Sequence, residues 1–189
     1  EEDEIIEDLN ITFSASKHLV AHSPEELADC MIEDIELAKR YLYRGQLEKW
    51  LKPYPELALE MQEIVEKRYP KDQNTGALAA IYALNPTLPL TFKGSSRKGG
   101  EACSRKIFNF KDVGNFCNDA IPDGPTWDSL SSDIFLEWVR CKDKALADRL
   151  PASKDDVEVA MVRVQILDPL SDLNLINDPS DELYAMTGE

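Results

Sequence analysis

One segment of the chain occurs twice, and this recurrence constrains the fold more than any other feature of the sequence. Residues 42–52 read LYRGQLEKWLK and residues 130–140 read LSSDIFLEWVR, which aligns Trp50 with Trp138. The surrounding positions keep their apolar or charged character rather than their identity. The recurrence therefore predicts two tandem copies of one scaffold, with both tryptophans buried in the core, and it indicates no duplicated active site.

Helical periodicity and capping signals outline the first copy. They predict a first helix at residues 23–44, which opens with Ser23-Pro24 and ends at Gly45 in the left-handed conformation. The other elements expected in this copy are a helical turn at 46–51, a helix that ends before Pro70, and a helix that ends at Asn85-Pro86.

The same order begins again in the second half of the chain. The expected elements are helices at 108–120, 130–140 and 144–150, and a last helix that opens at a capping box, Ser153–Asp156, and ends at Asp168-Pro169. The stripe expected to be buried on this last helix is Val157, Ala160, Met161, Val164 and Leu167.

Short alternations of apolar and polar residues predict three strand-like segments, at 9–13, 88–92 and 173–176. Because such short strands are not stable alone, we expect the first two to pair with each other or to pack on helices.

These elements predict a mainly α fold of two similar helical lobes, residues 9–92 and 93–176, each with about four helices. An acidic linker at 1–8 and an acidic tail at 177–189 flank the lobes. Because the chain begins at Glu1 in this acidic run, without an initiator Met, we expect it to be a fragment of a longer protein.

The net charge of −15, from 36 acidic and 21 basic residues, bears on the class of partner. Phosphate binding depends on clustered lysine and arginine, so direct contact with nucleic acid is not expected, and anionic membrane surfaces are disfavoured for the same reason. No apolar run approaches the roughly 20 residues that cross a bilayer, and no signal segment opens the chain. These features predict a cytoplasmic protein whose partner is another protein.

Metal-binding and catalytic motifs are not evident in the sequence. The four cysteines form no Cys-x-x-Cys pair and have the distribution of reduced, buried thiols: Cys30, Cys103, Cys117 and Cys141. His18 and His22 are spaced for one helical face, but the helix begins only at Pro24 and no third ligand lies nearby. No motif supports a Ser-His-Asp or Cys-His arrangement, so we expect no catalytic residue, metal or cofactor.

The clearest chemical difference between the copies is a longer, basic segment in the second, at 94–106. We expect it to be a flexible loop, and its candidate partner contacts are Arg97, Lys98, Arg105 and Lys106, which form a cationic island together with Lys93 and Lys111. Gly99 is followed by Gly100 and Glu101 rather than by lysine and a hydroxyl, so a phosphate-binding loop is disfavoured. A partner-docking or protease-sensitive loop and a solvated variable loop remain as alternatives.

Three segments carry a resemblance to known proteins: residues 23–28 (SPEELA), 45–51 (GQLEKWL) and 84–90 (LNPTLPL). Together they resemble a helical repeat unit of bacterial multidomain signalling and stress proteins, where it accompanies kinase-like or caspase-like modules. The chain also resembles the C-terminal part of the accessory protein of type III-E CRISPR systems. The resemblance covers most of residues 9–92 and only thinly 93–176, where equivalents of Pro24 and Gly45 are missing.

The CRISPR resemblance implies a protein substrate, cut by a caspase-like peptidase that is held on an RNA-guided effector. No residue of this chain matches a cleavage site of that family. We therefore expect a non-enzymatic regulatory or protease-substrate module that acts by protein contact, with a caspase-like peptidase complex or a transcription factor as the partner. The rival hypothesis is a small cytoplasmic enzyme with an unrecognised active site.

Overall fold

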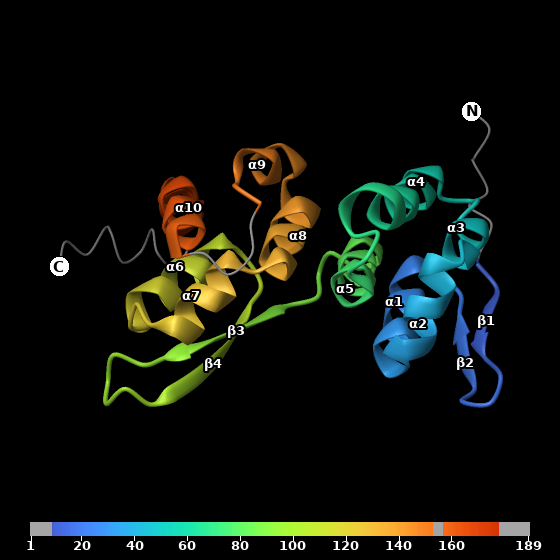
Figure 1. Ribbon diagram of the computed structural model, residues 1–189, viewed down its shortest axis with the longest axis horizontal. Helices are drawn as coiled ribbons and strands as arrows, with labels where there is room; N and C mark the ends of the chain where they lie inside the picture. Colours follow the sequence, from blue (N-terminus) through green and yellow to red (C-terminus); the bar gives the residue numbers. More distant parts are fainter. Residues whose placement is uncertain (1–8, 153–156, 178–189) are drawn as a thin grey trace. The chain divides into compact units, whose positions relative to one another are not determined.

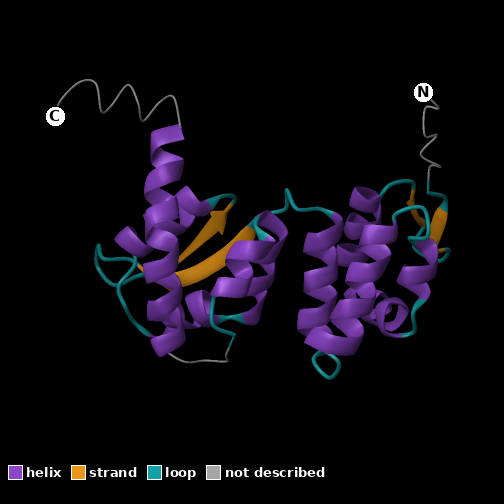
Figure 2. Ribbon diagram, turned by 90° about the horizontal axis from the view of Figure 1, so that it is seen from above, coloured by secondary structure: helices purple, strands orange, loops and turns teal. Residues whose placement is uncertain are grey.

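The computed structural model describes residues 9–152 and 157–177, with side chains described as far as Leu167. The chain divides into two compact units between Pro86 and Thr87, ahead of the predicted division after residue 92. Helices make up most of both units, and the prediction of a mainly α fold is confirmed (Figures 1 and 2).

The first unit opens with an antiparallel hairpin that is followed by helices. Its elements are β1 (Ile11–Ser14), β2 (Leu19–Ala21), α1 (Pro24–Glu33), α2 (Ile35–Tyr43), α3 (Gln46–Trp50), α4 (Pro55–Glu63), the π-helical turn η1 (Ile64–Arg68) and α5 (Gln73–Leu84). Helix α5 packs against α1 and α2, and Gly45 ends α2 at a φ of 78°, as the sequence predicts.

The second unit also opens with an antiparallel hairpin. Its elements are β3 (Leu90–Ser95), β4 (Ala102–Ile107), α6 (Phe110–Asp119), α7 (Gly124–Ser131), α8 (Asp133–Lys142), α9 (Lys144–Arg149) and α10 (Val157–Asn177). Helix α10 packs against α6 and α7.

The strand predictions hold in part. The segments at 9–13 and 88–92 do not pair with each other, because β1 pairs with β2 and β3 pairs with β4. The predicted alternative, packing on helices, is confirmed: buried Phe13 packs on Tyr41 of α2, and buried Phe92 packs on Phe116 of α6. The segment at 173–176 is helical and belongs to α10, which continues through Pro169 instead of ending there. Short apolar segments of this kind fit either period, so the helix could not be distinguished from a strand by pattern alone. The capping box at 153–156 lies outside the described residues.

The first predicted helix is broken at Asp34 into α1 and α2. Asp34 has a non-helical backbone (φ −138°, ψ 80°), and its carboxylate accepts a hydrogen bond from the backbone N–H of Leu37 at 3.2 Å. The same carboxylate lies 2.9 Å from Nζ of Lys17 in the turn of the first hairpin. Aspartate favours this capping position over a helix interior, because its side chain competes for backbone donors.

The two tryptophans lie in different surroundings. Trp138 is fully buried, with its ring against Phe110 and Phe135, whereas Trp50 is only half-buried, with its ring against Phe13 and Tyr41. The prediction that both are mostly buried therefore holds fully for Trp138 and in part for Trp50. In the second unit the hairpin phenylalanine, Phe92, contacts the rings of Phe116 and Phe135 and has no ring contact with Trp138 among the described residues.

Candidate functional site

The basic segment at 94–106 was expected to be a loop, but it forms the larger part of an ordered β-hairpin. Strands β3 and β4 pair without a register shift from Leu90↔Ile107 to Ser95↔Ala102, so only residues 96–101 form a connecting turn. Gly99 and Gly100 have φ values of 83° and 68°, which glycine adopts without strain. This adjacent glycine pair is the sequence signal that could have indicated a hairpin.

The inner face of the hairpin is fixed by aromatic packing. Phe92 is buried, and its ring centroid lies 5.0 Å from that of Phe116 on α6 and 5.0 Å from that of Phe135 on α8. Gly94 is required beside them, because a Cβ there would lie 2.7 Å from Oγ1 of Thr126 and 2.9 Å from Cζ of Phe116. The strand can approach the helices this closely only without a side chain at position 94.

The outer edge of β3 is bonded to the helices and the loop beside it. The Ser129 hydroxyl on α7 donates to the Lys93 carbonyl at 2.7 Å and accepts from the Lys93 N–H at 3.0 Å. Further along, the Ile121 N–H donates to the Ser95 carbonyl at 2.7 Å, and the Arg97 N–H donates to the Asp119 carbonyl at 2.9 Å. These bonds use both backbone groups of Lys93 and the carbonyl of Ser95, which an edge strand would otherwise leave unpaired.

Asp123 strengthens the same attachment at the start of α7. Its carboxylate accepts from the backbone N–H and the hydroxyl of Thr126, at 3.3 Å and 3.1 Å. A hydrogen bond with the Ser95 side chain is the largest cause that lowers the pKa of Asp123, and the two bonds from Thr126 lower this pKa further. The charged carboxylate therefore links the end of β3 to the N-terminus of α7.

The four candidate contact residues do not share one face. Arg97 and Lys98 are exposed in the turn, and Lys106 is exposed on the outer face of β4, diagonally across from Lys93. Arg105 lies on the opposite face, where its guanidinium pairs with the Asp119 carboxylate of α6 at 2.6 Å. The exposed cluster is thus Lys93, Arg97, Lys98 and Lys106, which we call the hairpin cations.

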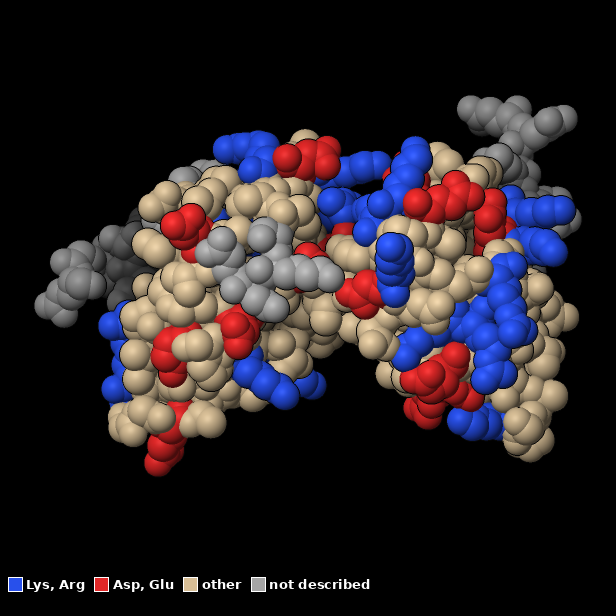
Figure 3. All heavy atoms as spheres, viewed as in Figure 1, with Lys and Arg blue, Asp and Glu red and all other residues tan. Residues whose placement is uncertain are grey.

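Charge alone does not distinguish this cluster. Basic side chains lie beside acidic ones over much of the face shown in Figure 3. What distinguishes the hairpin cations is that a paired, anchored backbone carries them, so little backbone conformational entropy remains to be lost when a partner binds.

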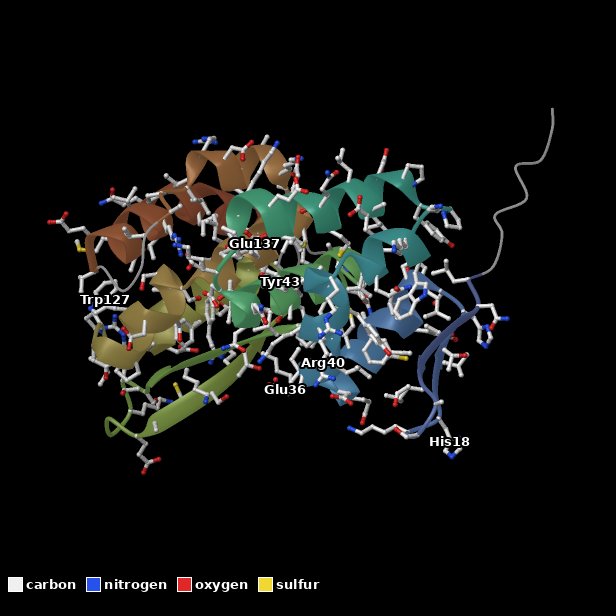
Figure 4. All side chains as sticks on the ribbon, turned by 45° about the vertical axis from the view of Figure 1, so that its right-hand side comes forward. His18, Glu36, Arg40, Tyr43, Trp127 and Glu137 are labelled. Atoms are coloured by element: carbon white, nitrogen blue, oxygen red, sulfur yellow. The ribbon has the colours of Figure 1, made fainter. Side chains whose placement is uncertain are left out.

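The histidines and cysteines considered as metal ligands or nucleophiles do not come together in a site among the described residues. His18 adopts a φ of 56° at the tip of the first hairpin and points away from the helices (Figure 4). Within the described ranges, no group of three or more His, Cys, Asp or Glu residues is arranged to hold a metal ion. The cysteines are free thiols; Cys30 is buried, whereas Cys103, Cys117 and Cys141 are only half-buried.

The linings of two open grooves show no recognisable set of catalytic residues. One, of about 380 Å³, runs between β3 and α7 and is lined by Thr91, Lys93, Asp128, Ser129 and their neighbours. The other, of about 550 Å³, runs between α3 and α4 in the first unit and is lined by Glu48, Lys49, Lys52 and mainly apolar neighbours. Neither lining includes a histidine or a cysteine.

No protein-family model matches this chain, and neither does any curated protein or solved structure. Among the described residues, no helix combines the length and apolar character needed to cross a membrane. What the site can do is therefore inferred from its own residues.

Proposed function

We propose that this chain is a non-enzymatic module that acts by contacting another protein, and that the hairpin cations form the contact. The observation that carries the proposal is the contrast between a net charge of −15 and four exposed basic side chains on one anchored hairpin. Charges held in fixed positions give an interface specificity and a faster encounter with an oppositely charged surface.

The partner in this proposal is a protein with an acidic surface in the cytoplasm. A chain with so large an excess of acidic residues repels phosphate backbones, so a protein fits the charge balance better than a nucleic acid. The resemblance to the type III-E CRISPR accessory protein suggests a more specific role, in which a caspase-like peptidase assembly binds this chain as its substrate. A transcription factor held by this chain is the corresponding regulatory role.

We propose further that the two units are diverged copies of one unit. The junction between hairpin and first helix supports this, because Ile11↔Ala21 and Leu90↔Ile107 pair two residues before the helix caps Ser23 and Asn109. At both junctions an acidic side chain reaches back to the residue before the cap: Glu26 accepts from the His22 N–H at 2.6 Å, and Asp112 accepts from the Phe108 N–H at 2.8 Å. In this scheme both copies share the hairpin, and what the second copy gained is the greater length of its strands and its cations.

The contact proposal is tested by reversing charge at the turn. We expect the double variant Arg97→Glu, Lys98→Glu to capture its specific partner from a native extract at least about tenfold less efficiently, since opposite charges are replaced by like charges. Thermal stability should change little, because both side chains are exposed and remote from the core. Bound proteins are quantified by mass spectrometry.

The matched control is Lys144→Glu, Arg149→Glu, which makes the same charge change on exposed positions of α9 in the same unit. Proteins lost with the turn variant and kept with the control are the specific partners. If both variants capture the same proteins in equal amounts, the hairpin cations are not the contact.

A further inference from the structure

The outer edge of β4 carries unpaired backbone groups. Both polar backbone groups of Lys93 bond to Ser129, away from β4, so Lys93↔Ser104 is a pair without mutual hydrogen bonds. In such a pair both residues direct N–H and C=O outward, and the alternation extends this to Ala102 and Lys106. No hydrogen bond from another described residue reaches the outward groups of these three residues.

The two edges of the hairpin therefore differ. The edge of β3 is bonded at Lys93 and Ser95 by α7 and by the segment that precedes it. In Figures 1 and 4 β4 lies at the margin of its unit, with β3 between it and α7. Ala102, Ser104 and Lys106 are all exposed, so an incoming chain can reach the backbone.

We propose that the open edge of β4 accepts an extended acidic segment of the partner protein as a third, added strand. This inference rests on the proposed protein-contact function and specifies its binding mode. Main-chain hydrogen bonds from Ala102, Ser104 and Lys106 supply affinity, and the neighbouring side chains select the sequence that binds.

Charge identifies the occupant as acidic. Lys106 stands on the edge strand itself, Arg105 is partly exposed on its other face, and Arg97 and Lys98 lie at the adjoining turn. A second copy paired edge to edge would bring these cations against their own equivalents, which is unfavourable. An acidic strand instead places carboxylates opposite Lys106 and beside the turn.

A defined peptide tests this binding mode. The probe is a blocked peptide of alternating glutamate and valine, about eight residues long, which matches the length of a typical strand. When the peptide binds to the full chain, the amides of Ala102, Ser104 and Lys106 should become protected from hydrogen exchange. The matched peptide of alternating lysine and valine should bind at least about tenfold more weakly.

Proline at position 104 separates strand addition from simple charge attraction. Because the Ser104 N–H faces outward, Ser104→Pro removes a donor for the added strand without removing a bond to β3. We expect the acidic peptide to bind Ser104→Pro at least about tenfold more weakly than it binds wild type. Its binding to Ser104→Ala should be unchanged. If thermal unfolding shows that Ser104→Pro has lost the hairpin, Ala102→Pro makes the same test nearer the turn.

The outcomes distinguish the two proposals. Acidic-peptide binding that leaves the three amides unprotected, or that is equal in the proline and alanine variants, overturns strand addition. Partner capture that survives Ser104→Pro and fails with the charge reversal at the turn leaves the contact function standing without strand addition. Capture that is indifferent to the charge reversal overturns the contact function itself, and equal binding of the lysine peptide overturns the acidic occupant.

Discussion

A single buried arginine holds together much of the second unit. The Arg163 side chain on α10 is fully buried, and its guanidinium donates to three backbone carbonyls. Nη1 lies 2.9 Å from the Leu130 oxygen and 2.8 Å from the Ser132 oxygen, where α7 meets α8, and Nη2 lies 2.9 Å from the Pro151 oxygen beyond α9. One side chain therefore connects three helix ends to α10.

Replacing Arg163 with methionine should destabilise the second unit by about 3–5 kcal/mol. Methionine keeps most of the length but leaves the carbonyls without this donor, and each buried unsatisfied group costs roughly 1–3 kcal/mol. The matched control is Arg149→Met on the exposed side of α9, which should stay within about 0.5 kcal/mol of wild type. Urea unfolding measures both, and equal midpoints for the two variants would show that the guanidinium contributes no net stability.

The position of Arg163 also shows why the expected stripe on α10 is partly wrong. Ala160 and Leu167 are buried as predicted, but Val157 and Met161 are largely exposed, and Val159 and Arg163 are buried beside the first two. Hydrophobic periodicity predicts that charged residues of a helix face solvent. It therefore could not predict the burial of Arg163, which depends on hydrogen bonds to carbonyls of three other segments.

At the scale of elements, the helix ends that depend on local sequence signals could be predicted, whereas the elements that depend on tertiary contacts could not. The capping sequence at Ser23-Pro24 and the exit at Asn85-Pro86 predicted helix ends that the structure contains. The break at Asp34 was missed because the apolar period continues across it, although Asp34 caps α2 through the Leu37 N–H and is also held by Lys17 in the hairpin turn. Strand β4 was missed because its apolar content is low and it is held by pairing with β3. The basic residues of the site could be selected by charge, but which of them share a face depends on that pairing.

Asp34 makes the junction of α1 and α2 sensitive to acid. A hydrogen bond from Lys17 is the main cause that lowers the pKa of Asp34, and the Leu37 N–H lowers it further. A carboxyl whose pKa is lower in the folded state contributes stability above its unfolded pKa, near 3.9, and loses that stability as the pH falls through the folded value. Asp34→Asn, which keeps a cap oxygen but no charge, should therefore unfold at a lower temperature than wild type at neutral pH.

The difference between wild type and Asp34→Asn should shrink as the pH falls below about 4. Asp29→Asn makes the same substitution at an exposed aspartate on α1 and serves as the control. Thermal unfolding followed by circular dichroism across this pH range measures the effect. A difference that stays constant with pH would mean that the loss comes from the cap geometry and not from the ion pair.

At the scale of the whole molecule, the position of the unit boundary follows from strand pairing. Division after residue 92 would cut β3 in two and assign Leu90 and Phe92 to the first unit, yet these residues pair with Ile107 and Arg105 of the second unit. The buried rings that surround Phe92 also belong to the second unit. Division between Pro86 and Thr87 keeps each hairpin with the helices on which it packs.

Two pairs of fragments test this boundary. We expect residues 87–189 to unfold cooperatively, and residues 93–189 to be less stable by at least about 3–5 kcal/mol, the usual loss when a buried phenylalanine is removed. For the first unit we expect no difference between the two fragments. Residues 9–86 and 9–92 should be equally stable, because the segment 87–92 pairs with β4 of the second unit. Urea unfolding of the four fragments provides both comparisons. Equal stability of 87–189 and 93–189 would mean that β3 contributes little to its unit, and a hairpin so weakly held could not present Lys106 and the open edge of β4 in a fixed position.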